Sequence, residues 1–351
     1  MKNKKGLLLI SIGFILMFSC DSYDTTVTNT VHADGSITRK VVMRNDNNGE
    51  FDPGQYQVPV DSSWITEITM EIDEEHDTVW ILTAEKFYES TAGLNESYQA
   101  DSGVNKLMQR HTSFSKSFRW FTTVFRFSET IEAALEIECP VSDFLTEEEL
   151  EFFYLPHSIQ KLVEEGPDSL ETREMLTSLE ENSETWYMTC LVRSGLTNFY
   201  TLFSEYPGNE RDKEDIMSLE SEIMALLKEE KDEETIFIKV FGEEFYSEYK
   251  HVIDSALDKL EEDWAPSFQA DNYDVRTRMP GRVISTNGYI LTEETDSAEE
   301  EILWTVSGEY FLSEEYEMWV ESRINNYYAW VVSVLFVLFG ITGFIIYYRK
   351  R

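Results

Sequence analysis

The sequence has little positive charge and few of the side chains that usually carry chemistry. It contains 29 Lys and Arg against 67 Asp and Glu, a net charge of −38, with three cysteines and five histidines among 351 residues. Proteins that bind nucleic acid or anionic lipid surfaces need clusters of Lys and Arg to neutralise phosphates. The composition therefore predicts neither of these as a partner, and it favours an acidic surface that serves solubility over one that binds cations.

The sequence also lacks the short motifs of common catalytic sites. It has no GxSxG, HExxH or P-loop pattern, and no GxGxxG after a predicted strand. The histidines show no ligand spacing: His32, His76, His111, His157 and His251. His76 stands in the acidic segment 73–77, which is more typical of a solvated turn than of a metal site. These absences favour a non-enzymatic protein. The alternative is a periplasmic hydrolase or metal-dependent enzyme whose site is assembled from residues distant in the sequence.

A long uncharged run, YAWVVSVLFVLFGITGFIIYY, occupies residues 328–348. At about 1.5 Å per residue it covers the ~30 Å hydrocarbon core of a bilayer. Tyr and Trp stand at its ends, and the basic tripeptide 349–351 follows. The run predicts a transmembrane helix with a cytoplasmic tail rather than the buried helix of a soluble domain.

The N-terminus has the arrangement of an export signal. Three lysines precede an apolar run over residues 6–18, which ends in Ser19-Cys20. A small residue directly before a cysteine is typical of bacterial lipoprotein signals, so we expect residues 1–19 to be removed and Cys20 to be lipidated. An uncleaved N-terminal anchor is the alternative. Either way the chain between the two ends is extracytoplasmic, and the protein belongs to the cytoplasmic (inner) membrane as a single-pass protein.

The exported part is more acidic than the whole chain. Six of the 29 basic residues lie in the two terminal segments, which leaves 23 basic against 67 acidic residues and a net charge of −44. Cys139 and Cys190 also lie in this part, where an oxidising compartment permits a disulfide between them. Two buried thiols are the alternative.

A polar loop near residue 49 offers oxygen ligands around a glycine, as calcium loops do. The candidate ligands are Asp46, Asn48, Glu50 and Asp52. Their spacing differs from that of an EF-hand, so a plain polar turn is the alternative and no other cofactor is indicated.

Residues 20–139 have the pattern of strands. The segment Thr25–Arg44 is broken by Asp34-Gly35, which predicts a hairpin with a type I′ turn. Residues 64–72 alternate, which predicts a half-buried strand with residues 79–86 as its partner.

An aromatic segment over residues 114–127 has high strand propensity. Its apolar positions change parity near Trp120 and Phe121, and this change predicts a bulge or bend within the strand.

Residues 140–265 change to a helical pattern rich in acids. Thr146 and Glu149 form a capping box, and apolar residues then recur at three- and four-residue spacing. A last helix should start near Glu243 and stop before Pro266.

Strand patterns return over residues 266–312, where Asn287-Gly288 predicts a hairpin turn. Residues 313–327 have helical spacing and predict a juxtamembrane helix that continues into the span. The order of segments predicts an α+β fold, with an antiparallel sheet built from the N- and C-terminal halves, an inserted acidic helical block, and one C-terminal transmembrane helix.

Three segments together resemble a group of uncharacterised envelope lipoproteins of the Bacteroidota type. They are KSFRWFTTVFRFSET at 116–130, MPGRVISTNG with Trp304-Thr305-Val306 at 279–306, and ESRINNYYAW at 321–330. The PG, NG and Trp arrangement is also similar, more distantly, to the LppM-type domain of mycobacterial lipoproteins. The resemblance implies the same topology and fold, and it brings no catalytic residue with it.

The interpretation that these observations favour is a membrane-tethered extracytoplasmic lipoprotein that acts as a binding or envelope-assembly module. The membrane is its first partner. Another envelope or membrane protein is a possible second, and Glu321, Arg323 and Asn326 just before the span are the candidate contacts. A purely structural role for Arg323, pairing with a nearby acid or with headgroups, is the alternative.

Overall fold

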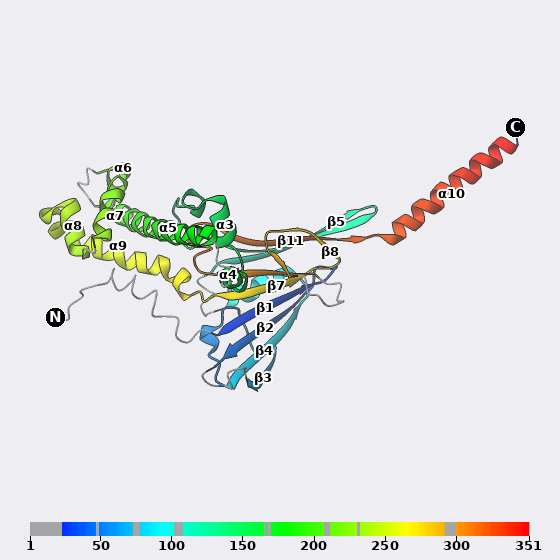
Figure 1. Cartoon of the computed structure of the whole chain (residues 1–351), viewed down its shortest axis with the longest axis horizontal. Helices are drawn as coiled ribbons and strands as arrows, with labels where there is room; N and C mark the ends of the chain where they lie inside the picture. Colours follow the sequence, from blue (N-terminus) through cyan, green and yellow to red (C-terminus); the bar gives the residue numbers. More distant parts are fainter. Residues whose placement is uncertain are drawn as a thin grey trace.

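The computed structural model of the chain describes residues 23–46, 49–72, 78–101, 108–164, 166, 170–206, 211–229, 232–291 and 300–350. Two β-sheets form the centre of the molecule, a helical block lies at one end, and a single helix projects from the other (Figure 1). The predicted α+β fold with an inserted helical block is confirmed. The predicted signal segment 1–19 and Cys20 lie outside the described residues.

The larger sheet joins the two halves of the chain. Its strands are β1 Asp24–Val31, β2 Ile37–Asn45, β3 Ile65–Ile72, β4 Thr78–Tyr88, β7 Tyr273–Arg278, β9 Tyr289–Leu291 and β10 Glu301–Val306. They lie in the order β3-β4-β2-β1-β7-β10-β9. Neighbours are antiparallel except β1 and β7, which run parallel where the N-terminal and C-terminal strands meet.

The smaller sheet also combines both halves. Its strands are β5 Arg110–Arg119, β6 Thr122–Ile131, β8 Arg282–Thr286 and β11 Tyr316–Asn325, in the order β5-β6-β11-β8, all antiparallel. One continuous apolar core contains side chains from both sheets, such as Val41, Phe125, Val275 and Val320. The single predicted sheet is therefore two sheets that share a core.

The aromatic segment 114–127 is a hairpin and not one bulged strand. Arg119 pairs with Thr122, so Trp120 and Phe121 form the whole turn between β5 and β6. The apolar parity changes there because the chain reverses direction. The first predicted hairpin is present, but residues 32–36 connect β1 to β2 as a longer loop, in which Gly35 has φ 94°.

The predicted hairpin at Asn287-Gly288 is wrong, because the two strands that it connects belong to different sheets. β8 pairs with β11, whereas β9 pairs with β10. The Asn287 Oδ1 atom accepts hydrogen bonds from the Trp319 backbone N–H at 2.9 Å and from Trp304 Nε1 at 3.1 Å. A side chain at Gly288 would meet the Trp304 ring at 2.4 Å. This dipeptide thus carries the chain from one sheet to the other.

The predicted juxtamembrane helix over residues 313–327 is also wrong. Residues 316–325 form β11, which pairs along its whole length with β6. Tyr316, Met318, Val320 and Ser322 are buried at every second position, which is the period of a strand. The apolar residues at three- and four-residue spacing are a coincidence of that alternation with the flanking aromatics.

Strand β3 is present, but it is not half-buried. It lies at the edge of the larger sheet, and Ile68, Met70 and Ile72 are 52%, 58% and 71% exposed. Its partner β4 is the strand predicted at residues 79–86. Alternation in β3 marks a strand correctly, but its residues are exposed on both faces.

The helices are α2 Thr91–Ala100, α3 Glu147–Phe153, α4 His157–Glu164, α5 Leu170–Phe203, α6 Lys213–Met217, α7 Glu220–Lys228, α8 Glu233–Phe241, α9 Glu243–Gln269 and α10 Tyr327–Arg349, with 3₁₀ turns η1 Pro53–Gln55 and η3 Val141–Asp143. The capping box of Thr146 and Glu149 opens α3 as predicted. Helix α9 continues through Pro266 instead of stopping before it. The carbonyl of Glu262 that loses its partner there belongs to an exposed residue, so water can replace the missing N–H.

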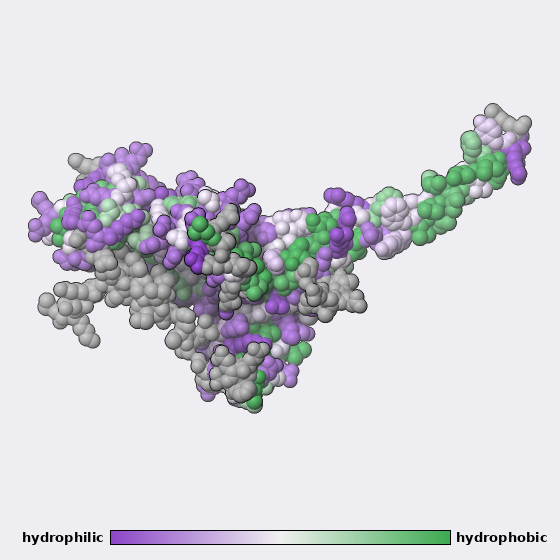
Figure 2. Space-filling view, viewed as in Figure 1, coloured by the Kyte–Doolittle hydropathy of each residue, from purple (hydrophilic) through white to green (hydrophobic). Residues whose placement is uncertain are grey.

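The two ends of the molecule differ in polarity. The surface of the helical block is mostly hydrophilic, whereas α10 is apolar along most of its length (Figure 2). In the described part of the chain, α10 is the one helix that is long and apolar enough to cross a membrane. Nearly all of its side chains are exposed, as a lipid-facing helix requires.

Candidate membrane-proximal site

The tip of the β5–β6 hairpin contacts the base of α10. The Trp120 Nε1 atom donates a hydrogen bond to Ser333 Oγ at 2.8 Å, and the Phe121 ring lies 4.3 Å from the Trp330 ring. In Figure 1 the hairpin reaches past the rest of the sheets to the start of this helix. Residues far apart in sequence therefore form one aromatic cluster where the folded domain meets the candidate span.

Asn326 joins strand β11 to helix α10. It is the only residue between β11 and α10, and its side chain is buried. Its Oδ1 accepts a hydrogen bond from Thr123 Oγ1 at 3.0 Å, and its Nδ2 donates to the carbonyls of Arg119 at 3.0 Å and Trp120 at 3.4 Å. Its backbone N–H donates to the Phe121 carbonyl at 2.9 Å. No loop separates the sheet from the helix, so the orientation of α10 is tied to that of the domain.

The other side of β11 is held by the turn before β8. Gly281 has φ 86°, and a Cβ atom there would lie 2.4 Å from the Arg323 carbonyl oxygen, so this close approach of two backbones requires glycine. The Ser322 hydroxyl is buried and donates to the Pro280 carbonyl at 2.9 Å. The motif residues at 280–281, 322 and 326 thus brace the last strand before the helix.

The three predicted partner contacts take different places. Glu321 forms an ion pair with Arg126 at 3.3 Å, and Arg126 also contacts Glu317 at 3.3 Å. Asn326 is used inside the protein, so its side chain is not available to a partner. Arg323 is exposed and forms no ion pair with a described residue.

The calcium candidates are only partly described, since Asn48 lies outside the described residues. The Asp52 carboxylate accepts a hydrogen bond from the Gly54 backbone N–H at 2.9 Å and so caps the turn η1. Among the described residues, no three His, Cys, Asp or Glu side chains are grouped so that they could hold a metal ion. Calcium binding stays a prediction.

The candidate residues of an enzymatic site are not brought together where the structure describes them. His111 is exposed on β5 and lies beside Asn95, whereas His157 starts α4 and lies 3.4 Å from the Tyr310 hydroxyl. Burial lowers the pKa of His157, against the opposing effect of Asp274. His76 lies outside the described residues.

Cys139 and Cys190 form a disulfide, with their Cα atoms 5.9 Å apart. It links the segment after β6 to the middle of α5. Trp186 Nε1 and Ser313 Oγ both donate hydrogen bonds to the Cys139 carbonyl, at 3.0 and 2.6 Å. The disulfide therefore lies at the joint between the helical block and the sheets.

A buried charged network was missed by the sequence analysis. Arg39 on β2 and Glu129 on β6 are 1% and 2% exposed, and their side chains form an ion pair of 2.5 Å that connects the two sheets. Tyr98 of α2 accepts a hydrogen bond from Arg39 and donates to Glu129 at 3.2 Å. Arg110 of β5 is also buried, with Nη1 3.6 Å from the Glu129 carboxylate.

The charges of this network balance only partly. Burial acts to raise the pKa of Glu129, but the guanidinium groups of Arg39 and Arg110 outweigh it and hold the pKa below the ordinary value. Arg110 Nε and Nη1 have no hydrogen-bond partner among the described residues. The guanidinium instead lies over the rings of Tyr98 and Tyr273, at 5.1 and 5.4 Å from their centres. The network joins β2 of the larger sheet to β5 and β6 of the smaller sheet, so it holds the two sheets together.

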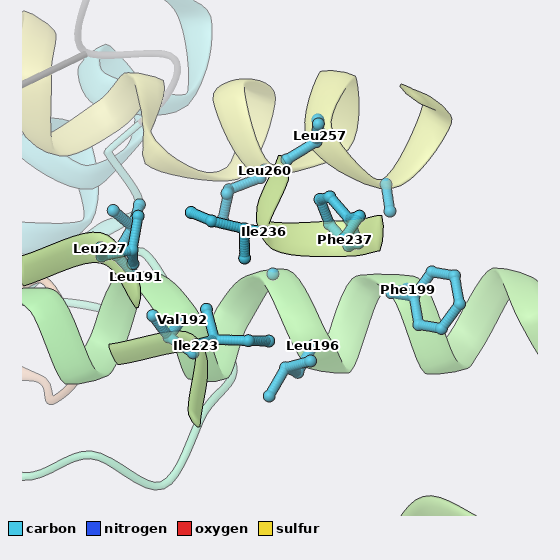
Figure 3. A pocket seen from close by; sticks show the side chains of 12 residues that line it. Leu191, Val192, Leu196, Phe199, Ile223, Leu227, Ile236, Phe237, Leu257 and Leu260 are labelled. Carbon is cyan, nitrogen blue, oxygen red and sulfur yellow. The ribbon is translucent and has the colours of Figure 1, made fainter. Parts of the chain in front are cut away.

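A small apolar cavity of about 60 Å³ lies inside the helical block (Figure 3). Its walls come from α5, α7, α8 and α9 and include Phe199, Ile223, Ile236 and Leu260. Such a lining offers no group for catalysis or for orienting a polar ligand. We interpret the cavity as imperfect packing between helices.

Gly195 lines this cavity in the middle of α5, and a Cβ atom there would meet Leu260 at an ordinary 3.6 Å. We expect Gly195→Ala to stabilise the chain by about 1 kcal/mol, because alanine is the better helix former and fills free space. Thermal unfolding of the full-length chain in detergent measures this. The matched control is Gly242→Ala, where φ is 91° and ψ is 155°, and where the same change should destabilise. A destabilising Gly195→Ala would show that there is no free space beside Gly195.

Comparison with protein-family models, with curated proteins and with solved structures finds no match for this chain. The interpretation of the site therefore stands on its own geometry.

Proposed function

We propose that this protein is a non-enzymatic, membrane-tethered module of the cell envelope that holds an acidic extracytoplasmic domain at a fixed orientation to the cytoplasmic membrane, for binding or assembly of neighbouring envelope components. In this proposal α10 crosses the membrane with its C-terminus in the cytoplasm, and a lipid on Cys20 gives a second anchor. The observation that carries the proposal is the joint at Asn326. A domain that needed only an anchor would be served by a flexible linker, whereas here the last strand runs into the helix through one buried residue.

The geometry also supports a place of action for such a module. The acidic helical block lies at the end of the molecule opposite α10 (Figure 1). Each residue of a helix adds about 1.5 Å, so the long helices α5 and α9 carry their far ends well away from the bilayer. A partner of the helical block is therefore met at a distance from the membrane that the joint keeps constant.

The test is to break the joint while keeping both parts. A short Gly-Ser linker inserted between Asn326 and Tyr327 leaves the anchor and the fold but frees the orientation. A photoreactive amino acid replaces Lys239, an exposed residue of α8, in cells that make the full chain. We expect a discrete crosslinked product with the intact joint and at least about a tenfold loss with the linker, because a flexible tether spreads the domain over many positions.

The matched control places the same linker between Tyr348 and Arg349, beyond the span, where the crosslink should persist. Equal crosslinking with both insertions would show that orientation is not used. Release of the chain from membranes by alkaline carbonate would show that α10 is no tether.

A further inference from the structure

One end of the smaller sheet has a local excess of positive charge in this acidic protein. The residues of the smaller sheet nearest α10 are 116–119 on β5, 122–125 on β6, 322–325 on β11 and 282–283 on β8. Together they contain four basic residues and no acidic one: Lys116, Arg119, Arg282 and Arg323. The net charge of the whole chain predicted no anionic lipid partner, but the charge at this end of the smaller sheet has the opposite sign.

The three arginines of this set share one face of the sheet. Arg323 lies directly opposite Arg282, and the register across β6 puts Arg119 on the same side. All three are exposed, and none forms an ion pair with a described residue. Glu300 also lies at this end, where it accepts a hydrogen bond from the Val283 backbone N–H at 2.7 Å. Glu321, two residues before Arg323 on the same face, is paired with Arg126 at 3.3 Å. Like charges directly opposite each other are destabilising, and an external anion would offset this repulsion.

The hairpin tip beside them is apolar and exposed. Phe118, Trp120 and Phe121 are 55%, 51% and 39% exposed. The tip reaches Ser333, six residues after the start of α10, which is about 9 Å along the helix axis. If Tyr327 and Tyr328 lie at the headgroup level, Trp120 lies at or below it. Aromatic rings with a polar edge prefer this depth of a bilayer.

We propose that the tip of the β5–β6 hairpin enters the outer interface of the bilayer that α10 crosses, and that Arg119, Arg282 and Arg323 bind the headgroups of anionic lipids there. The occupant of this surface is the lipid bilayer, because the surface is continuous with the base of α10. The proposal rests on the proposed function in that it takes α10 as a span. It adds a second membrane contact, which fixes the rotation of the domain about the helix axis.

The depth of the tip is measurable in the full chain. Cys20 is replaced by Ala, and Cys139 and Cys190 are bonded to each other, so one new cysteine carries a fluorescent label. The labelled variants are Phe118→Cys and Phe121→Cys at the tip, Ile68→Cys on the exposed strand β3, and Val337→Cys in α10. The chain is placed in vesicles with spin-labelled lipids that quench either at the headgroup or deep in the acyl region.

The expected result is strong headgroup-level quenching at the tip, at least about twofold above that at Ile68, and deep quenching at Val337. A tip that is quenched no more than Ile68 while Val337 is quenched would overturn this inference and leave the proposed function intact. An unquenched Val337 would instead remove the span and the proposed function with it. The two tip positions guard against a local folding defect in one of them.

The contact between the three arginines and the lipid headgroups is tested by a separate experiment. Raising phosphatidylglycerol from none to about 30 mol% in phosphatidylcholine vesicles should raise tip quenching at least about twofold, and salt of about 0.5 M should reverse this. The triple variant Arg119→Gln, Arg282→Gln, Arg323→Gln should lose the dependence on phosphatidylglycerol. The matched triple Arg44→Gln, Lys228→Gln, Lys239→Gln removes exposed basic residues elsewhere and should keep it. Dependence that persists in the first triple, or is absent in the parent, would overturn the arginine contact.

Discussion

Replacing Glu129 by Gln should lower the free energy of unfolding by about 3–5 kcal/mol, which is what the loss of one partner costs in a buried ion pair. The carboxylate balances two buried guanidinium groups, Arg39 at 2.5 Å and Arg110 at 3.6 Å. Without it both positive charges stay in the core between the sheets with no counter-charge. Urea unfolding of the full-length chain in detergent, followed by tryptophan fluorescence, measures the loss.

The matched control is Glu317→Gln, which removes one of the two carboxylates that pair with Arg126. Its side chain and that of Arg126 are each 39% exposed, and Glu321 remains to pair with the arginine. Surface pairs contribute about 0–1 kcal/mol, so the control should stay within that range. A Glu129 variant as stable as this control would mean that the sheets are held together without the charged network.

The same variant predicts a pH dependence. The pKa of Glu129 is lower in the folded chain than its ordinary value of 4.5. Below pH 4.5 the unfolded chain therefore binds more protons than the folded chain, and the free energy of unfolding decreases as the pH is lowered. The contribution is complete above pH 4.5 and disappears as the pH falls through the folded pKa. The stability difference between the parent and Glu129→Gln should therefore be constant near neutrality and narrow in acid.

This difference is needed because two half-buried carboxyl groups act in the opposite direction. Their partial burial raises the pKa of Asp271 and of Asp274. Each of these carboxyl groups increases the stability of the folded chain as the pH falls through its folded pKa. Their effects are common to both chains and cancel in the comparison. A stability difference between the parent and Glu129→Gln that widens in acid would contradict the lowered pKa of Glu129.

The elements that the sequence predicted well are those whose local signals agree. The hairpin of β1 and β2 around Asp34-Gly35, the capping box of α3 and the uncharged run of α10 each combine pattern with a boundary signal. Residues 313–327 contain two patterns. Their apolar residues alternate as in a strand, and the aromatic residues at both ends add the three- and four-residue spacing of a helix. Only the pairing with β6, which is far away in sequence, decides between them.

The buried network had a signal that the sequence analysis did not use. On the buried faces of their strands, Arg39 stands among Ile37 and Val41, and Glu129 between Phe127 and Ile131. A charge at the apolar parity of a strand is costly unless it meets a partner. Which partner it meets depends on the packing of two sheets, and no local pattern contains that. The site at Asn326 was predicted as a contact region, but its hairpin partner was hidden by the bulge interpretation.

Loss of the disulfide should have the second large effect. Replacing Cys139 and Cys190 together by Ala should lower the free energy of unfolding by about 3–4 kcal/mol, because the bond closes a loop across 51 residues and limits the unfolded chain. Chemical unfolding of the parent with and without reductant should give the same loss, and Cys20→Ala should give none. The loss should fall on the joint between α5 and the sheets, where the Cys139 carbonyl accepts hydrogen bonds from Trp186 and Ser313.

The same bond reports on which side of the membrane the domain lies. An exported chain should carry no reactive thiol at 139 or 190, whereas a chain made without residues 1–19 and retained in the cytoplasm should have both reduced. Alkylation of intact cells and mass spectrometry of the tryptic peptides separates the two. If both thiols react in the full-length chain, the domain is not in an oxidising compartment, and the orientation of α10 that places its C-terminus in the cytoplasm would have to be reversed.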